Sequence, residues 1–280
     1  MVKVGVHVSI AGSLALSVAR ALDAGCDTYQ IFSRNPRGWR FSDLDTGLVR
    51  EFRENLGATR IGPVVDHMPY LPNLAAPDGE NYGKSVATLT AELQRCGLLG
   101  IPYLVTHLGH HKGEGKPAGY RQVTAAVNRA LAGAPGDVML LLETTAGEKN
   151  SVGGTFEDLR AILDGIDERN RVGICYDTCH TFSAGYDFRT PEALGETLDH
   201  FHEVVGLPLL RAVHLNDARG ELGGHLDRHE HIGMGSIGEE GFRTFLHHPA
   251  IRKLPLICET PVDDRRDDRG NIAKVRQLAG

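Results

Sequence analysis

The stretch Val138-Met-Leu-Leu-Leu-Glu143 holds the longest apolar run in the chain and ends in a single carboxylate. Short apolar or β-branched runs of this kind, bounded by Gly, Pro or polar residues, predict buried β-strands. Seven more such runs occur at residues 2–8, 28–32, 62–67, 103–107, 172–177, 209–215 and 255–259. The sequence therefore predicts eight strands spread over its whole length.

The segments between these strands predict amphipathic helices, because apolar residues recur three and four positions apart. Leu14, Val18 and Ala21 give an example near the start of the chain. The same pattern covers residues 86–93, 123–130 and 194–205, and residues 43–56, 156–166, 239–247 and 263–278 supply the other four helices. Eight alternating βα units of about 25 to 45 residues are typical of a (β/α)8 barrel.

The 280 residues therefore predict one α/β domain, a single TIM barrel over residues 1–280. No Pro-, Gly- or Ser-rich linker divides the chain, which disfavours two doubly wound halves. A hydrophobic fraction of 41% and a mean hydropathy of -0.21 are typical of a soluble globular protein. The sequence shows neither a membrane span nor a signal peptide, so the expected location is cytoplasmic.

Charge and cysteine content argue against several classes of protein. The 36 acidic and 30 basic residues give a formal charge of -6, so any nucleic acid must be held locally rather than by a global attraction. Five scattered cysteines without a C-x-x-C pair argue against a disulfide framework and against a thiolate zinc site. The 14 His residues instead direct attention to metal or proton chemistry.

Polar side chains end seven of the eight predicted strands. They are His7, His67, His107, Glu143, Asp177, His214 and Glu259. A barrel gathers the carboxyl ends of its strands at one mouth, where such enzymes carry their chemistry. His180 lies three residues after Asp177, just beyond the end of its strand. Asp227 and His229 alternate after the seventh strand, a spacing that puts both side chains on one side of an extended segment.

Imidazoles and carboxylates without thiolates suit one or more Zn²⁺ or Mn²⁺ ions, and a carboxylate can bridge two of them. A single His at a strand end is more often a hydrogen-bonded packing residue than a ligand. Ten converging groups favour a metal centre, because buried charges must be paired or must coordinate an ion. Within this set His7 fits best as a residue that orients a ligand.

Two loops at the expected mouth carry side chains suited to nucleic acid. Arg34-Asn-Pro-Arg37-Gly-Trp-Arg40 follows the second strand, and His67-Met-Pro-Tyr70-Leu71-Pro follows the third. Arginine contacts phosphate well, and an exposed aromatic side chain beside an aliphatic one can act as a wedge in a base stack. Plain loop packing is the alternative for both. Residues 216–238 predict a long irregular segment, in which the glycines of residues 233–238 permit tight turns.

Four motifs are specific enough to indicate a family: Tyr176-Asp-Thr-Cys-His-Thr-Phe-Ser-Ala-Gly-Tyr-Asp187, His214-Leu-Asn-Asp-Ala218, Asp227-Arg-His-Glu-His-Ile-Gly-Met-Gly-Ser-Ile-Gly238 and Leu256-Ile-Cys-Glu-Thr260. In this order they resemble the signatures of the endonuclease IV family of apurinic/apyrimidinic endonucleases. The resemblance extends over residues 5–259. It implies a TIM barrel that uses three Zn²⁺ ions, with Mn²⁺ as an alternative, to cut damaged duplex DNA in base excision repair. The expected reaction is hydrolysis of the phosphodiester 5′ to an abasic site, which leaves a 3′-hydroxyl and a 5′-deoxyribose phosphate.

The resemblance also assigns residues to roles. The implied ligands are His67, His107 and Glu143 for the first ion, Glu143, Asp177, His214 and Glu259 for the second, and His180, Asp227 and His229 for the third. Glu143 would bridge two ions and orient a shared hydroxide as the nucleophile, and Glu259 is the second expected catalytic carboxylate. Arg37, Tyr70 and Leu71 would enter the DNA at the lesion. The family often has Gln after this Arg, whereas Gly38 stands here.

Two other functions fit the same fold. A sugar or sugar-phosphate isomerase or epimerase would use one or two metals, but it leaves the third ligand set without an evident use. A non-catalytic metal-binding protein would close every coordination shell, whereas the resemblance implies an open position. No obligate protein partner is evident, and the resemblance favours a monomer.

Overall fold

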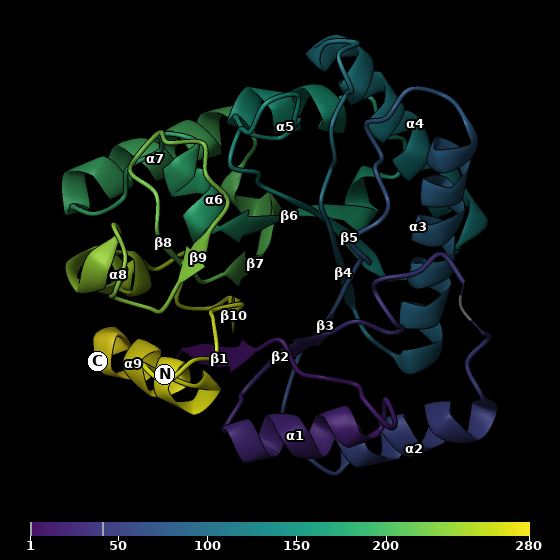
Figure 1. Cartoon of the computed structure of the whole chain (residues 1–280), viewed down its shortest axis with the longest axis horizontal. Coiled ribbons are helices and arrows are strands. Elements are labelled where there is room, and N and C mark those ends of the chain that lie inside the picture. The colour runs from purple at the N-terminus through teal and green to yellow at the C-terminus, as the bar shows by residue number, and fades with distance from the viewer. Residues whose placement is uncertain (1, 41) are drawn as a thin grey trace.

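The computed structural model describes residues 2–40 and 42–280 and has the predicted barrel architecture (Figure 1). Eight parallel strands form one sheet in the order β1-β10-β7-β6-β5-β4-β3-β2. A parallel bridge between His7 and Gln30 connects the two ends of this order, so the sheet curves into a barrel. The strands are β1 (Lys3–Val6), β2 (Tyr29–Ile31), β3 (Val64–His67), β4 (Tyr103–Thr106), β5 (Met139–Glu143), β6 (Val172–Asp177), β7 (Leu210–His214) and β10 (Pro255–Cys258).

Helices surround the strands on the outside, as the helical periodicity predicts (Figure 1). They are α1 (Leu16–Ala24), α2 (Thr46–Gly57), α3 (Glu80–Leu99), α4 (Lys116–Gly133), α5 (Phe156–Leu163), α7 (Pro191–Val204), α8 (Gly238–His247) and α9 (Asp268–Ala279), with 3-10 turns at Arg169–Arg171 and Leu207–Leu209. Side chains cap four of these helices. Asp45, Thr155, Thr190 and Asp267 each accept a hydrogen bond from the backbone N–H three residues ahead.

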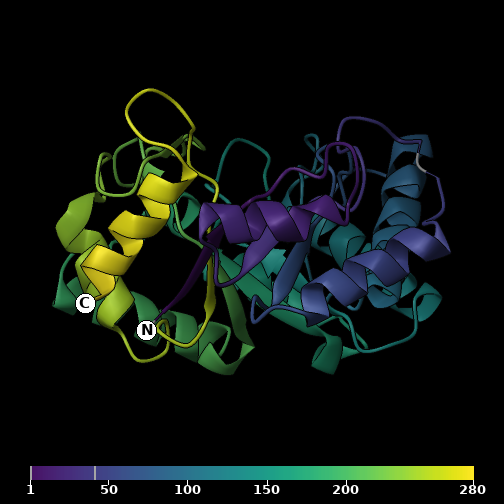
Figure 2. The ribbon, with the colours of Figure 1, turned by 90° about the horizontal axis from the view of Figure 1, so that it is seen from below.

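The first and last βα units lie side by side and complete the ring of helices (Figure 2). The guanidinium of Arg276 in α9 donates to the Gly25 carbonyl at 2.7 Å and to the Asp27 carboxylate at 2.9 Å. Gly25 ends α1 with a φ of 81°, a left-handed conformation that glycine adopts without strain. Contacts between the two ends of the chain therefore close the barrel on the outside as well.

Alternation along the strands divides the apolar core in two. Outward side chains such as Leu140 and Leu142 pack beneath the helices. Inward side chains form a small layer inside the barrel, made of Val65, Val105, Leu141, Cys175, Ala212 and Ile257. Side chains two positions apart on a strand point the same way, so the next inward positions lie at the carboxyl mouth.

Two local elements differ from the prediction. Helix α6 (Thr178–Ser183) follows β6 directly, where no helix was expected. Residues 216–238 are not irregular throughout, because β8 (Asp217–Ala218) pairs in antiparallel fashion with β9 (His229–Glu230). Both elements are too short to show a hydrophobic period, which is the signal that sequence reasoning uses.

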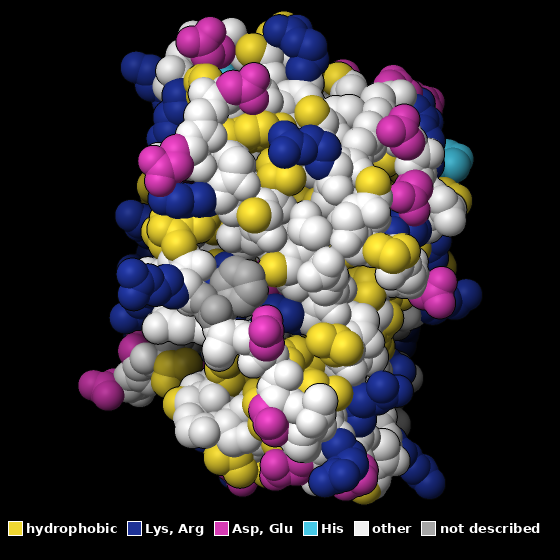
Figure 3. Space-filling view, turned by 90° about the vertical axis from the view of Figure 1, so that its right-hand side faces the viewer, with side chains coloured by type: hydrophobic (Ala, Val, Ile, Leu, Met, Phe, Trp, Pro, Cys, Tyr) yellow, Lys and Arg dark blue, Asp and Glu magenta, His cyan; other side chains and the backbone are white. Residues whose placement is uncertain are grey.

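The outer surface carries mixed charge. On the face in Figure 3, acidic and basic side chains are interspersed, and the described part of that face shows no large area of one sign. The described part of this face therefore offers no broad attraction for the phosphates of nucleic acid. Within residues 2–40 and 42–280, no helix is both long and apolar enough to cross a membrane.

Candidate metal centre

Strand geometry brings six of the nine candidate ligands together. Each stands two residues after a member of the inner layer: His67 after Val65, His107 after Val105, Glu143 after Leu141, Asp177 after Cys175, His214 after Ala212 and Glu259 after Ile257. The period of two therefore turns all six side chains into the mouth. Six parallel strands contribute one polar group each to a single layer above the apolar one.

Short local elements supply the other three ligands. The Asp177 carboxylate accepts a hydrogen bond from the His180 backbone N–H at 2.8 Å, so it caps α6 and turns His180 back toward the barrel axis. His229 belongs to β9, and its pairing with β8 holds the segment that also carries Asp227. These contacts explain how residues outside the barrel strands reach the same site.

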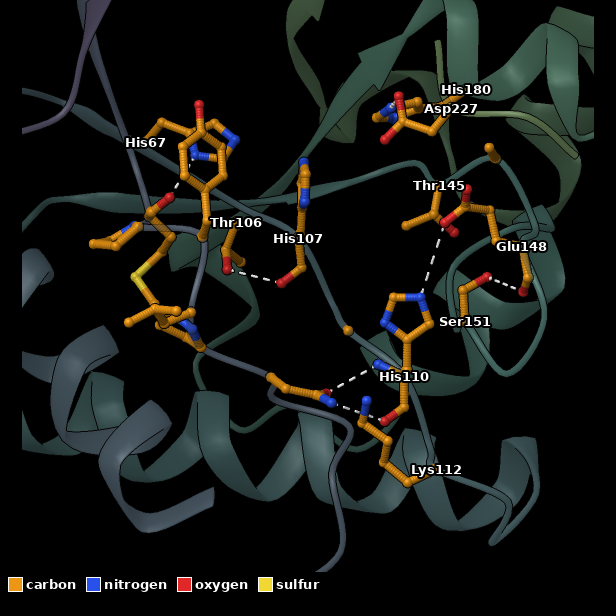
Figure 4. A pocket seen from close by; sticks show the side chains of 18 residues that line it. His67, Thr106, His107, His110, Lys112, Thr145, Glu148, Ser151, His180 and Asp227 are labelled. Carbon is orange, nitrogen blue, oxygen red and sulfur yellow. Dashed lines mark hydrogen bonds and ion pairs between the residues drawn. The ribbon is translucent and has the colours of Figure 1, made fainter. Parts of the chain in front are cut away.

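The first ligand group is centred on Glu143, whose side chain is completely buried. One carboxylate oxygen, Oε2, lies 2.9 Å from His107 Nε2 and 3.4 Å from His67 Nε2. His67 and His107 also line a cavity of about 290 Å³ at the mouth, together with His180 and Asp227 (Figure 4). The group therefore has one face toward the interior and one toward the space that a substrate can enter.

The second group uses the other oxygen of Glu143. His214 Nδ1 lies 2.9 Å from Glu143 Oε1 and 3.2 Å from Glu259 Oε2. The Asp177 carboxylate is 3.9 Å from the same nitrogen. Because the two Glu143 oxygens face different groups of side chains, this carboxylate is placed to bridge two ions.

The third group consists of His180, Asp227 and His229. One Asp227 oxygen lies 3.1 Å from His180 Nε2 and 3.5 Å from His229 Nε2. Among the described residues, neither of these buried imidazole nitrogens makes a well-directed hydrogen bond. Buried polar atoms are rarely left unpaired, so two such nitrogens beside a carboxylate fit a divalent cation.

Backbone carbonyls fix the orientation of three of the imidazoles. His67 Nδ1–H donates to the Met68 carbonyl at 2.6 Å and His180 Nδ1–H to the Thr144 carbonyl at 2.9 Å. His229 Nδ1–H donates to the Glu259 carbonyl at 3.1 Å. These bonds place the proton on Nδ1 and leave the Nε2 lone pair directed into the site, as metal-ligating His residues require.

Ion pairs hold the metal-free cluster together. Burial would raise the pKa of Glu143, but the facing imidazoles of His107 and His214 hold that pKa well below its usual range. Burial would lower the pKa of His180, yet the carboxylates of Asp177, Glu143 and Asp227 raise it well above its usual value. Metal ions would displace these protons, so loading is expected to release them.

The donor set fits divalent ions. In each of the three groups the ligand atoms lie within 4.8 Å of one another, and the groups are those implied by the resemblance: His67, His107 and Glu143; Glu143, Asp177, His214 and Glu259; His180, Asp227 and His229. Cys179 lies close to Asp177 and His229, but burial raises the pKa of its thiol. Nitrogen and oxygen donors without a thiolate suit Zn²⁺ or Mn²⁺.

The three residues expected to enter DNA lie on exposed loops beside this centre. Tyr70 is 64% exposed and Leu71 is 43% exposed, unusually high values for large apolar side chains. The Tyr70 ring packs edge-on against Phe32, a wall of the site, at 5.1 Å between centroids. Arg37 is exposed on the neighbouring loop, which the Tyr70 N–H joins by donating to the Pro36 carbonyl.

Arg34, in the loop expected to contact nucleic acid, is placed differently. Arg34 is buried and pairs with Glu92 of α3, so it anchors the loop instead of facing solvent. The pairing joins residues 58 positions apart, which no local spacing reveals. An added Cβ at Gly38 would meet no atom of the described residues within 4 Å. Crowding by these residues therefore does not explain why Gly38 stands where the family often has Gln.

The glycine-rich segment, residues 233–238, surrounds the side-chain carboxylate of Asp217. The Asp217 carboxylate accepts hydrogen bonds from the backbone N–H groups of Gly233, Gly235 and Gly238. Gly233 and Gly238 adopt φ values of 81° and 72°, where other residues are strained. The loop is therefore a tight turn wrapped around Asp217, as expected for these glycines, and its N–H groups are occupied.

Sequence reasoning missed several residues that support the ligands. Asn216 donates to Asp177 Oδ2 at 2.8 Å and accepts from the Glu259 N–H at 2.7 Å. Gln30 contacts both His214 and Glu259 from β2, the one predicted strand without a polar end. His7 does not belong to a ligand group and instead lies 3.1 Å from the Gln30 amide nitrogen. An amide inside an apolar strand was the available signal for Gln30.

Comparison with known proteins defines the class of this fold and site. A family model described as xylose isomerase-like TIM barrel matches residues 18–278, so the chain is a TIM barrel of that class. It is 66% identical over 281 residues to a probable endonuclease 4 of Methanoculleus marisnigri, with 100% of both chains covered. It is 55% identical over 282 residues to a probable endonuclease 4 of Methanosphaerula palustris, covering 100% of this chain and 99% of the relative. The chain belongs to the endonuclease IV family of apurinic/apyrimidinic endonucleases.

Solved structures agree with this assignment. The structure of endonuclease IV from Thermus thermophilus matches with a TM-score of 0.86 at 35% identity, over 99% of this chain and 98% of that one. A 3-keto-D-glucoside 4-epimerase from E. coli matches with a TM-score of 0.72 at 13% identity, over 99% of this chain and 100% of that one. The second likeness shows the fold alone.

Proposed function

We propose that this protein is a metal-dependent endonuclease that hydrolyses the phosphodiester 5′ to an abasic site in duplex DNA. The expected products are a 3′-hydroxyl and a 5′-deoxyribose phosphate. The observation that carries this proposal is the arrangement of three neighbouring ligand groups, two of which share Glu143, beside a cavity at the mouth. The relatives named endonuclease 4 support it.

The chemistry divides between the ligands and their ions. When bound, three Zn²⁺ ions, or Mn²⁺ in one or more positions, would make hydroxide available at neutral pH and would neutralise charge on the phosphate. Glu143 and Glu259 act as the catalytic carboxylates and orient the attacking water, because both belong to the ligand groups whose ions would supply it. His180, Asp227 and His229 face the same opening and position the scissile phosphate.

The exposed loops provide selection for damaged DNA. Arg37 contacts the backbone, while Tyr70 and Leu71 insert at the lesion, where a missing base leaves a gap in the stack. An apolar pair that is half exposed in the free protein gains burial when it fills this gap. One chain supplies all three ligand groups and both loops, so we propose that it acts as a monomer on damaged duplex DNA.

Incision of a duplex with one tetrahydrofuran abasic analogue tests this proposal. The analogue cannot undergo β-elimination, so only hydrolysis cuts it. We expect cleavage immediately 5′ of the analogue, loss of cleavage after exhaustive chelation and recovery with Zn²⁺ or Mn²⁺. An intact strand with metal-loaded protein would overturn the proposal and leave sugar epimerisation on the same barrel as the next reaction to assay.

A further inference from the structure

Gln30 is a polar side chain inside an apolar strand. Its neighbours Tyr29 and Ile31 point outward into the core beneath the helices, so Gln30 points into the barrel. The residue is completely buried, and its backbone pairs with His7 and with Val65 of β3. A buried amide in this place must have its hydrogen bonds satisfied locally.

Both ends of the amide contact candidate ligands of the second group. Gln30 Nε2 lies 2.6 Å from Glu259 Oε1, and Gln30 Oε1 lies 2.8 Å from His214 Nε2. The Glu259 carboxylate can only accept a hydrogen bond, so the NH₂ end must face Glu259. The carbonyl end therefore faces His214, whose Nε2 must carry a proton and donate it.

The second N–H of the amide is also used. Gln30 Nε2 lies 3.1 Å from His7 Nδ1. The amide nitrogen can only donate, so His7 Nδ1 accepts this hydrogen bond. Both N–H donors of the amide are then used. The His7 ring packs against Phe32 at 4.3 Å between centroids, and this contact limits the movement of the network. Every hydrogen-bonding direction around the Gln30 amide is thus consistent with one arrangement.

We infer that Gln30 is a positioning residue for the second metal site, an inference that rests on the metal-dependent function proposed above. The bond from His214 Nε2–H keeps a proton on Nε2. Nδ1, which lies 2.9 Å from Glu143 Oε1 and 3.2 Å from Glu259 Oε2, is then the nitrogen left to ligate an ion. The bond to Glu259 Oε1 occupies one oxygen and turns the other toward His214. A single neutral side chain thus aligns two ligands from β7 and from the end of β10.

Backbone carbonyls do the same for His67, His180 and His229, through Nδ1. His214 is reversed, since its Nδ1 faces the site and its Nε2 points away from it. At that nitrogen the acceptor is the Gln30 side chain instead of a backbone carbonyl. Changing such an outer partner typically costs about 10- to 100-fold in metal affinity.

The test replaces Gln30 by Met, which keeps the length of the side chain and removes its hydrogen bonds to Glu259, His214 and His7. Wild-type and Gln30→Met proteins are loaded with Zn²⁺, dialysed against graded chelator and analysed for bound zinc. We expect the variant to release one equivalent at about 10- to 100-fold lower chelator concentration. Gln94→Met is the matched control, because Gln94 lies on α3, is exposed and donates to the Gly133 carbonyl. It should retain zinc as the wild type does.

A second readout reports the tautomer. In ¹⁵N side-chain spectra of the zinc-loaded wild type, we expect a protonated Nε2 and a ligating Nδ1 for His214, and a mixture in the variant. If Gln30→Met does not fold, Gln30→Ala leaves space for a water and serves instead. Equal zinc retention and an unchanged His214 spectrum in the variant would overturn the inference about Gln30 and leave the proposed function standing. A wild type that binds no zinc at His214 would overturn the proposed function as well.

Discussion

Replacing Glu143 by Gln removes the charge at the centre of the site and preserves the shape of the side chain. The carboxylate lies within 3.5 Å of four imidazole nitrogens, those of His67, His107, His180 and His214. A Gln amide can offer an oxygen to only one pair of these rings and turns its NH₂ group toward the other pair. The variant therefore loses a shared ligand and leaves buried imidazoles without their counter-charge.

The magnitude follows from this loss. Removing one partner of a buried charged pair costs about 3–5 kcal/mol. At about 1.4 kcal/mol for each factor of ten, metal affinity should fall by about 10²- to 4 × 10³-fold. Incision should fall by at least as much at limiting metal, because Glu143 also orients the attacking water in the proposed reaction. The fold should persist, since the apolar layer beneath Glu143 is unchanged.

The assay measures bound zinc and the rate of incision of the tetrahydrofuran duplex for the same preparations. Glu148→Gln is the matched control, because Glu148 lines the same cavity, is 45% exposed and lies 4.0 Å from His110 Nε2, outside hydrogen-bond distance. Its zinc content and rate should stay within a few-fold of the wild type. A Glu143→Gln protein that keeps three zinc ions and full turnover would show that Glu143 is neither a shared ligand nor a catalytic carboxylate.

Three further predictions follow from other parts of the structure. Arg37→Ala and Tyr70→Ala should each raise KM for the tetrahydrofuran duplex about tenfold with bound zinc unchanged, because a charged hydrogen bond to phosphate and a stacking contact are each worth about 1–3 kcal/mol. A fall in zinc content would contradict this division of roles. Chelation should lower Tm, because ions that bind only the folded state add about 2.7 kcal/mol at 100 times their Kd; equal melting with and without metal would count against a folded-state site. Burial raises the pKa of Asp158, but hydrogen bonds from Tyr120 and Lys116 outweigh it and lower that pKa. The ionised form therefore stabilises the fold above about pH 4, and this contribution is lost on acidification. Asp158→Asn should lower the free energy of unfolding in urea by about 2 kcal/mol at pH 7 and by less at pH 3. An equal loss at both pH values would contradict the assignment.

The strands and the ligands at their ends were predictable because one physical rule governs both. Alternation places Leu141 and Glu143 on the same inward side, and the parallel barrel repeats this on its other strands. Arg34 illustrates the opposite case. Its place three residues before Arg37 suggests an exposed side chain that contacts nucleic acid. The structure instead buries it against Glu92, on a helix far along the chain.

Supporting residues were harder to predict for a related reason. The role of Gln30 depends on His214 and Glu259, which are 184 and 229 residues away in the sequence. Helix α6 begins because the Asp177 side chain caps it, and six residues carry no periodic signal. Sequence patterns therefore locate the first layer of ligands, while the partners that orient them depend on tertiary contacts.

The most direct test of the central claim is a crystal structure of the zinc-loaded protein with an anomalous difference map at the zinc edge. We expect three peaks: one at His67, His107 and Glu143, one at Glu143, Asp177, His214 and Glu259, and one at His180, Asp227 and His229. An empty mouth, or zinc bound only elsewhere on the protein, would contradict it.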